Sequence, residues 1–358
     1  MLDRFKVPED IAVRIPPAMM HQAVVDIFVA LGMPEANASQ GADTLLYADV
    51  RGIDSHGVSN MMRAYVAGLK GGSVNPDPQW KATADNKGAV NIDSDKGLGI
   101  VVGPHCMRLA IERAREYGVA IVTAHNGGHY GAAAYHAHLA LEADMIGISM
   151  TTGGVLVTPT QGAEPLLGLN PIGIAAPTAE TEPYLFDASM SSVAANKIGL
   201  LRRVGGQALP GWVSGPDGAP IMEETDVPDD FMMLPLGGTR EIGSHKGYGM
   251  MMFVEILTSL LAGSGGGPLR RDGSAHCFMA INVGAFGDAG NFKADMDAYN
   301  QRLLDCKPAP GETRVVYAGV PEQEAATERN QKGIPYHPDV IEWFRETMDE
   351  LGVAQPFN

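Results

Sequence analysis

Residues 118–152 read GVAIVTAHNGGHYGAAAYHAHLALEADMIGISMTT, and this stretch decides the fold class. It predicts a buried strand, then a glycine-rich turn, a helix of small residues and a second strand. The same alternation of apolar strands and helices extends over residues 89–300. Such alternation is typical of an α/β core, in which helices cover a sheet.

Helical patterns flank this core on both sides, in three segments over residues 17–70 and again in the last part of the chain. We therefore expect a helical N-terminal lobe over 1–75, an α/β cofactor and substrate core over 76–320, and C-terminal helices over 321–358 that join the N-terminal lobe. Within the core we expect Pro104 to start a helix. We expect residues 249–263, GMMMFVEILTSLLAG, to form a buried helix, because they are too few to span a bilayer and include Glu255.

The composition narrows the range of partners. Lys and Arg number 26 and Asp and Glu number 42, so the net charge is −16. So acidic a chain repels phosphate backbones and anionic headgroups, which argues against nucleic acid and membrane partners. The cysteines, Cys106, Cys277 and Cys306, form no CxxC pair, and the N-terminus has no apolar leader pattern. We therefore predict a cytoplasmic protein without a disulfide framework or a cysteine zinc site.

Two histidines lie in turns that suit acid–base chemistry. His56 follows Asp54 and Ser55 in RGIDSHGV (51–58), so a carboxylate and a hydroxyl are available to fix its tautomer. His129 lies in HNGGHYG (125–131), after a buried strand, where α/β sheets place ligand-binding groups. In the plainer interpretation, Asp54 or Ser55 caps the next helix and His56 is a surface residue.

The histidines also raise the question of a metal site. His125, His129, His136 and His138 fall close together in the chain. A metal-dependent hydrolase is therefore one alternative function, and a ligand-binding protein without catalysis is another. The spacing does not match HExxH and few carboxylates are near, so we predict no metal.

Other segments suit the phosphates of a dinucleotide. Residues 187–192, DASMSS, end a strand and open a helix, where hydroxyls and backbone N–H groups can cradle a diphosphate. His245-Lys246-Gly247 starts another helix, and a lysine there can meet a phosphate. Simple N-capping and a solvated lysine explain the same residues without a ligand. GLGIVVG (97–103) lacks the GxGxxG spacing and a following acidic strand end, so a Rossmann fold is not predicted.

Five blocks now occur in a fixed order: RGIDSHGV (51–58), HNGGHYGAAAY (125–135), GLNPIGIAAP (168–177), FDASMSSVAANKI (186–198) and GSHKGYGMMMFVEIL (243–257). Together they resemble the malate/L-lactate dehydrogenase family of non-Rossmann, NAD(P)-dependent oxidoreductases. The resemblance implies a three-layer, mixed-sheet core of the sulfolactate dehydrogenase-like type, with a helical lobe formed by both termini. It implies a homodimer that uses NAD or NADP and transfers a hydride between the nicotinamide and a 2-hydroxy or 2-oxo acid or a related carbinol. Reduction of a cyclic imine acid is the alternative.

The resemblance also implies roles for individual residues. His56 or His129 would be the proton donor or acceptor, and Ser55 would hydrogen-bond the same oxygen or orient the histidine. Residues 319–322 are matched to a cofactor segment for which Pro310-Gly311-Glu312 competes. The implied cofactor contacts are Asp187, Ala188, Ser189, His245, Lys246, Gly319, Pro321 and Glu322.

One position departs from the family pattern. Asn60 stands where many relatives carry an arginine suited to a substrate carboxylate, and a tyrosine expected nearby is displaced to Tyr65. An amide cannot give the bidentate, charge-assisted pair that arginine gives a carboxylate. Arg51, Asn60 and Arg63 are therefore the candidate substrate-binding residues, and the identity of the substrate stays open.

Overall fold

A seven-stranded mixed sheet forms the centre of the computed structural model, which describes residues 3–357. The strands, in their order across the sheet, are β2 (Lys81–Asn86), β3 (Ala89–Asp93), β4 (Val119–Gly127), β10 (Ser274–Asn282), β5 (Met145–Thr151), β6 (Ile172–Ala176) and β7 (Tyr184–Ala188). Only β3 and β4 run parallel, and the other neighbouring pairs are antiparallel. The mixed sheet confirms the predicted fold class, and it is not the parallel sheet of a Rossmann domain.

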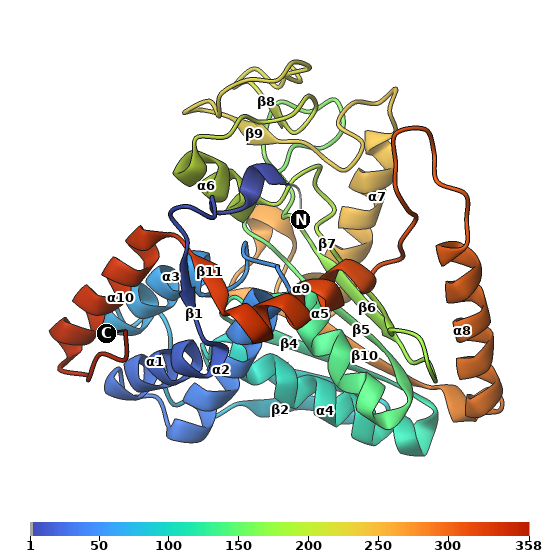
Figure 1. Ribbon diagram of the computed structural model, residues 1–358. Helices are drawn as coiled ribbons and strands as arrows, with labels where there is room; N and C mark the ends of the chain where they lie inside the picture. Colours follow the sequence, from blue (N-terminus) through green and yellow to red (C-terminus); the bar gives the residue numbers. More distant parts are fainter. Residues whose placement is uncertain (1–2, 358) are drawn as a thin grey trace.

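The two faces of the sheet pack against different helices (Figure 1). Because side chains alternate along a strand, Val122 of β4 packs against α4 (Gly99–Tyr117) while Ile121 packs on the opposite side, with α7 (Ser244–Glu255). The short helices α5 (Ala133–His138) and η2 (Leu139–Ala143) lie beside α4, and the π-helix η3 (Ile256–Leu260) continues α7. Three layers result, as predicted.

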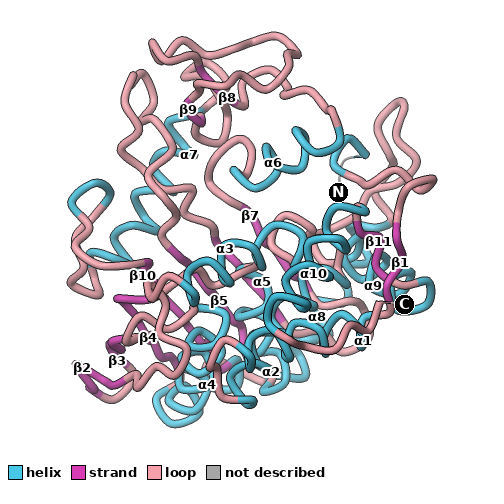
Figure 2. Tube along the Cα trace, turned by 90° about the vertical axis from the view of Figure 1, so that its left-hand side faces the viewer, coloured by secondary structure: helices cyan, strands magenta, loops and turns pink. Residues whose placement is uncertain are grey.

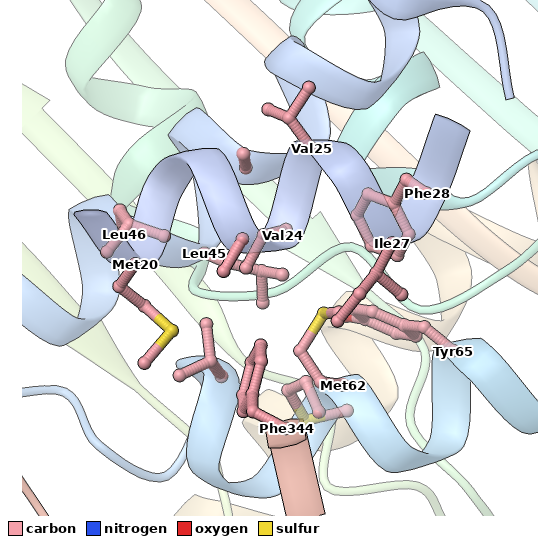
Figure 3. Packing of buried hydrophobic residues seen from close by; sticks show 14 of the residues in the cluster. Met20, Val24, Val25, Ile27, Phe28, Leu45, Leu46, Met62, Tyr65 and Phe344 are labelled. Atoms are coloured by element: carbon pink, nitrogen blue, oxygen red, sulfur yellow. The ribbon is translucent and has the colours of Figure 1, made fainter. Parts of the chain in front are cut away.

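Both ends of the chain build one helical lobe. Helices α1 (Pro17–Ala30), α2 (Glu35–Val50), α3 (Val58–Lys70) and α10 (Pro338–Leu351) share a single core. In Figure 3, Val24 and Phe28 of α1 face Leu45 of α2, Met62 of α3 and Phe344 of α10. The strands β1 (Val13–Ile15) and β11 (Ile334–Tyr336) pair antiparallel beside this core (Figure 2). The exact boundaries at residues 75 and 320 stay a prediction.

The remaining elements surround the edges of the sheet. They are η1 (Asp3–Phe5), α6 (Ala195–Val204), β8 (Val213–Ser214), β9 (Met232–Met233), η4 (Gly267–Leu269), η5 (Val283–Ala285), α8 (Ala289–Leu304) and α9 (Val320–Lys332). Helix α8 stands at the side of the molecule with almost all of its residues accessible to solvent (Figure 1). Over residues 3–357, no helix has the length and apolar character needed to cross a membrane.

Two sequence expectations about helices are wrong. Pro104 lies inside α4, not at its start. A proline leaves the carbonyl four residues earlier without its helical partner, and the Thr44 hydroxyl donates to that Ile100 carbonyl at 2.9 Å instead. Residues 249–263 are only half buried: Met251 and Val254 face the sheet, whereas Phe253 on the other side is 47% exposed.

A buried polar network joins the C-terminal segments to the turn that carries His56. The Arg329 guanidinium of α9 donates to the Asp54 carboxylate and to the Asp49 carbonyl. The Asp49 carboxylate accepts from the Val58 N–H at 3.0 Å and from the Tyr336 hydroxyl at 2.9 Å. Residues 51–57 are therefore held from both sides.

Replacing Arg329 with Met should lower the free energy of unfolding by about 3–5 kcal/mol, because Asp54 is left as an uncompensated, largely buried charge. Urea denaturation followed by circular dichroism measures the loss. The matched control is Arg314→Met, which removes an exposed ion pair between Arg314 and Glu324 of α9. This change should alter the free energy of unfolding by no more than about 0.5 kcal/mol. Equal effects of the two changes would contradict this account.

Candidate active site

Two imidazole rings from distant parts of the chain stack on each other. His56 comes from the turn before α3, and His129 follows β4. Their centroids are 5.7 Å apart and their planes differ by 17°. Both residues are partly accessible to solvent. The structure thus brings together the two histidines that the sequence singled out separately.

Hydrogen bonds fix the tautomer of His129. The Gly131 backbone N–H donates to Nδ1 at 3.2 Å, and the Tyr65 hydroxyl lies 2.7 Å from the same nitrogen. A backbone N–H can only donate, so Nδ1 accepts and the ring proton lies on Nε2. Nε2–H is therefore the group that His129 offers to a ligand.

His56 has a more adaptable partner. Its Nδ1 lies 2.8 Å from the Ser55 hydroxyl, which can either donate or accept. The ring can therefore hold a proton on Nδ1 and leave Nε2 as a base, or carry both protons while Ser55 accepts. This freedom, which His129 lacks, suits a residue that exchanges a proton.

The surroundings keep both rings uncharged at neutral pH. Burial lowers the pKa of His129 to about 4. Burial, with smaller contributions from His129 and from the Lys197 ammonium, lowers the pKa of His56 to about 3. A neutral imidazole is the form that accepts a proton or donates a hydrogen bond without charge.

The side chains of the predicted substrate-binding residues do not converge on one site. The Arg51 guanidinium lies over the Tyr47 ring and donates to Gln323 in a groove of about 440 Å³ between α2 and α9. Arg63 donates to the Asp339 carbonyl at 3.2 Å and lies over the Trp343 ring. Both guanidinium groups are therefore engaged with the C-terminal helices.

Asn60 contacts α6 instead. Its amide nitrogen donates to the Asn196 carbonyl at 3.3 Å, and its oxygen accepts from Arg203 at 3.2 Å. Arg203 also donates to the Ser59 carbonyl. The guanidinium next to Asn60 thus comes from a helix more than 130 residues away in sequence, where no local spacing could reveal it.

Two of the predicted cofactor segments lie along β7, with Gly319 at its start and Asp187 near its end. Asp187 is partly buried, its carboxylate accepts from the Ala134 N–H at 2.7 Å, and burial raises its pKa to about 6. Gly319 lies so close to β7 that an added Cβ would be 2.5 Å from the Pro183 carbonyl. Glu322 accepts from the Gly319 N–H at 3.0 Å, and Pro321 lies between them in the first turn of α9. The competing residues 310–312 are in an exposed turn.

The third predicted cofactor segment, His245-Lys246, is linked to the turn after β7 by one loop. His245 and Lys246 are exposed in the first turn of α7, where the His245 ring contacts Arg240 at 2.9 Å. The Leu236 N–H donates to the Met190 carbonyl, and Gly247 packs on the Leu236 backbone. The loop around Leu236 thus connects the turn containing Ala188 and Ser189 to the start of α7.

The histidine cluster does not converge on a metal site. His125 pairs with Asp272 at 3.0 Å, whereas His136 contacts the Tyr130 carbonyl and His138 packs on Tyr47. Over residues 3–357, no group of three or more His, Cys, Asp or Glu side chains is arranged to hold a metal ion. The geometry gives the metal-hydrolase alternative no support.

The model of the malate/L-lactate dehydrogenase family matches residues 15–345. This chain belongs to the malate/L-lactate dehydrogenase family. The family resemblance derived from the five sequence blocks is thereby confirmed. The chain is therefore an oxidoreductase.

Several members of the family are similar over nearly their whole length. The malate dehydrogenase of Pyrococcus abyssi is 37% identical over 348 residues, which cover 95% of this chain and 96% of that protein. The L-sulfolactate dehydrogenase of Methanocaldococcus jannaschii is 30% identical over 95% of this chain and 97% of its own. The solved structure of malate dehydrogenase from Pyrococcus horikoshii superimposes with a TM-score of 0.88 at 34% identity, covering 98% of each chain.

The NMR signals of His56 and His129 should stay constant from about pH 8 to pH 5 and shift only at lower pH, because burial lowers both pKa values. Histidine selectively labelled at the ring carbon allows the titration, and the variants His56→Gln and His129→Gln assign the signals. The urea-unfolded chain is the control, with midpoints near about 6.5. A midpoint near that value for either ring in the folded protein would contradict the burial argument.

Proposed function

We propose that this dehydrogenase uses NAD or NADP to interconvert a 2-hydroxy acid and its 2-oxo acid, with the proton exchanged by His56. The observation that carries the proposal is the stacked pair of neutral imidazoles, of which one has a fixed Nε2–H and the other is free to change protonation. A bound nicotinamide supplies the acceptor or donor of the hydride.

The two histidines have different roles in this proposal. During oxidation, Nε2 of His56 takes the hydroxyl proton while the Ser55 oxygen accepts from Nδ1–H, so the imidazolium stays hydrogen-bonded. Nε2–H of His129 donates to the same substrate oxygen and stabilises the negative charge that develops there. In the reverse direction, the His56 imidazolium returns the proton. Tyr65 keeps the His129 ring in place.

The segments around β7 fit a dinucleotide. The close approach of Gly319 to Pro183 and Leu185 packs the start of α9 on the start of β7. The exposed Lys246 ammonium at the start of α7 suits a phosphate, because the helix N-terminus adds positive charge. The residues proposed to hold the cofactor are Asp187, Ala188, Ser189, His245, Lys246, Gly319, Pro321 and Glu322.

Glutamine substitutions separate the two roles. His56→Gln should lower kcat by about 10²–10⁴-fold, as should His56→Ala, since neither side chain exchanges a proton. His129→Gln keeps an N–H donor near the position of Nε2, so it should lose less activity than His129→Ala. The assay follows NADH and NADPH consumption with oxaloacetate, pyruvate and cyclic imine acids.

Three results would overturn parts of this proposal. If no 2-oxo acid supports turnover with either cofactor, the substrate class is wrong. If only a cyclic imine acid is reduced, the alternative function applies. If His56→Gln keeps wild-type turnover while His129→Gln and His129→Ala are equally inactive, the two roles must be exchanged.

We propose that the enzyme is a homodimer that pairs through an apolar surface on α7 and η3. This surface is one helical stripe of five exposed side chains, Met250, Phe253, Ile256, Leu260 and Leu261, each 41–55% exposed. A contiguous apolar stripe of this kind is typical of a protein interface. Two copies related by a two-fold axis would cover each other's stripe, so no different protein is needed to bury it.

Light scattering after gel filtration tests the dimer. Phe253→Asp should convert the wild-type dimer to a monomer, because two carboxylates would face an apolar partner surface. Phe286→Asp is the control, since Phe286 is 74% exposed and is not one of these five residues. A monomeric wild-type protein over the whole range of concentrations, or equal dissociation of both variants, would contradict the proposal.

We also propose a cytoplasmic location. Cys106 and Cys277 are buried as free thiols, and Cys306 is an exposed free thiol. An exposed, unpaired thiol suits a reducing compartment. The net charge of −16 gives the protein no electrostatic attraction to anionic membrane surfaces, which agrees with this location.

A further inference from the structure

Lys197 is unusual among the lysines of this protein. It lies in the first turn of α6 and is partly buried. In the part of the chain that the structure describes, its ammonium has no hydrogen-bond acceptor and no carboxylate partner. The ammonium lies over the Phe5 ring, 5.4 Å from the ring centroid, in a cation–π contact. By contrast, the partly buried Lys293 is paired with Asp144 at 2.9 Å.

The position of α6 places Lys197 beside the catalytic histidines. Asn196, the preceding residue, accepts from Asn60 through its carbonyl and donates to the Met61 sulfur at 3.3 Å. Asn60 lies one helical turn beyond the His56 turn, so the start of α6 packs on the start of α3. The Lys197 charge adds to the lowering of the His56 pKa, which is mainly due to burial, and it partly opposes the burial that raises the pKa of Asp187.

An ammonium in this position needs an anion. It has three N–H donors, and a partly buried cation without an acceptor is costly. Burial lowers the pKa of Lys197, which is the expected result when no partner compensates for lost hydration. Asp187 forms no ion pair with Lys197 in the described part of the chain, and its carboxylate accepts from the Ala134 N–H. No acceptor among the described residues satisfies this ammonium, so its N–H donors are available to an anionic ligand.

We propose that Lys197 binds the carboxylate of the substrate and so sets the preference of the enzyme for hydroxy and oxo acids. This inference rests on the proposed function and adds a residue to it. Asn60 cannot serve this purpose alone, because both ends of its amide are occupied by α6. Lys197 acts by binding and orientation, while proton exchange stays with His56.

The first test compares charged and uncharged substrates. Lys197→Met should raise KM for oxaloacetate and pyruvate at least tenfold with kcat nearly kept, because a charge-assisted pair is lost. It should leave kcat/KM for methyl pyruvate, which has no carboxylate, within about threefold. Lys197→Arg keeps the cation and should restore part of the affinity. Lys293→Met is the matched control and should match wild type.

Direct binding gives a readout that does not depend on turnover. Isothermal titration of the wild-type protein with oxalate, in the presence of NADH, should show binding that Lys197→Met weakens at least tenfold. The NADH dissociation constant should be the same in both proteins. Circular dichroism checks the fold, and Lys197→Gln is used instead if the Met variant does not fold.

The outcomes separate this inference from the proposed function. If wild type reduces oxo acids and Lys197→Met does so with unchanged KM, only the role of Lys197 is wrong. If kcat falls equally for pyruvate and methyl pyruvate, Lys197 takes part in the chemical step and the carboxylate assignment is overturned. If the NADH constant alone changes, Lys197 binds cofactor. If wild type reduces no oxo acid but oxalate binding depends on Lys197, the proposed function fails while the anion site stands.

Discussion

The buried carboxylate of Asp49 is the constraint on which the active-site turn depends. It lies under the turn that carries His56, accepts from the Val58 N–H and the Tyr336 hydroxyl, and has its pKa raised to about 7 by burial and by the nearby Asp54 charge. A Cβ at Gly57 would lie 1.6 Å from Asp49 Oδ1. The glycine after His56 is therefore required by close approach to this carboxylate, and its φ of −88° needs no special residue.

This constraint also explains why the C-terminal segments belong to the catalytic lobe. Tyr336 comes from β11 and Arg329 from α9, yet both bind Asp49 in α2. Removing water from such groups is costly, and the partners supplied by the C-terminal segments offset part of that cost. The helices at the end of the chain thus do more than cover an apolar core, because they hold the Ser55–His56 pair in position from about 280 residues away.

The fold could be predicted largely from patterns with a short period. The run Val119–Ala124 has the apolar residues of a strand buried on both faces, and the structure packs α4 and α7 on its two sides. Patterns of this kind do not report what covers a surface. The apolar stretch of α7 predicts burial equally well against the sheet and against another molecule, and only the structure shows that Phe253 faces outward. The prediction that Pro104 starts a helix was wrong for a similar reason. The Thr44 hydroxyl, which replaces the hydrogen bond that the proline cannot make, is on another helix.

The site could be predicted only as a set of residue types. His56 and His129 were identified from their turns, but their stacking joins segments 73 residues apart. Tyr65 looked like a displaced family residue, and the structure shows it bound to His129. Lys197 and Arg203 had no local signal at all, since lysine and arginine on a helix are usually solvated. What distinguishes them is the absence or weakness of their partners, which is a property of the tertiary structure.

The net charge of −16 makes cations that are paired with no carboxylate important. A negative protein repels both a hydroxy acid and a dinucleotide at long range, but surface charges farther away than about 8 Å are largely screened at physiological ionic strength. A cation inside a partly dry cleft acts over a few ångströms in a lower dielectric, so its attraction exceeds the screened repulsion. Lysines already paired, such as Lys293 with Asp144, add nothing to this local field. Affinity for an anion is therefore decided by the cations that the fold leaves without a carboxylate, and among the described residues Lys197 is such a cation near His56.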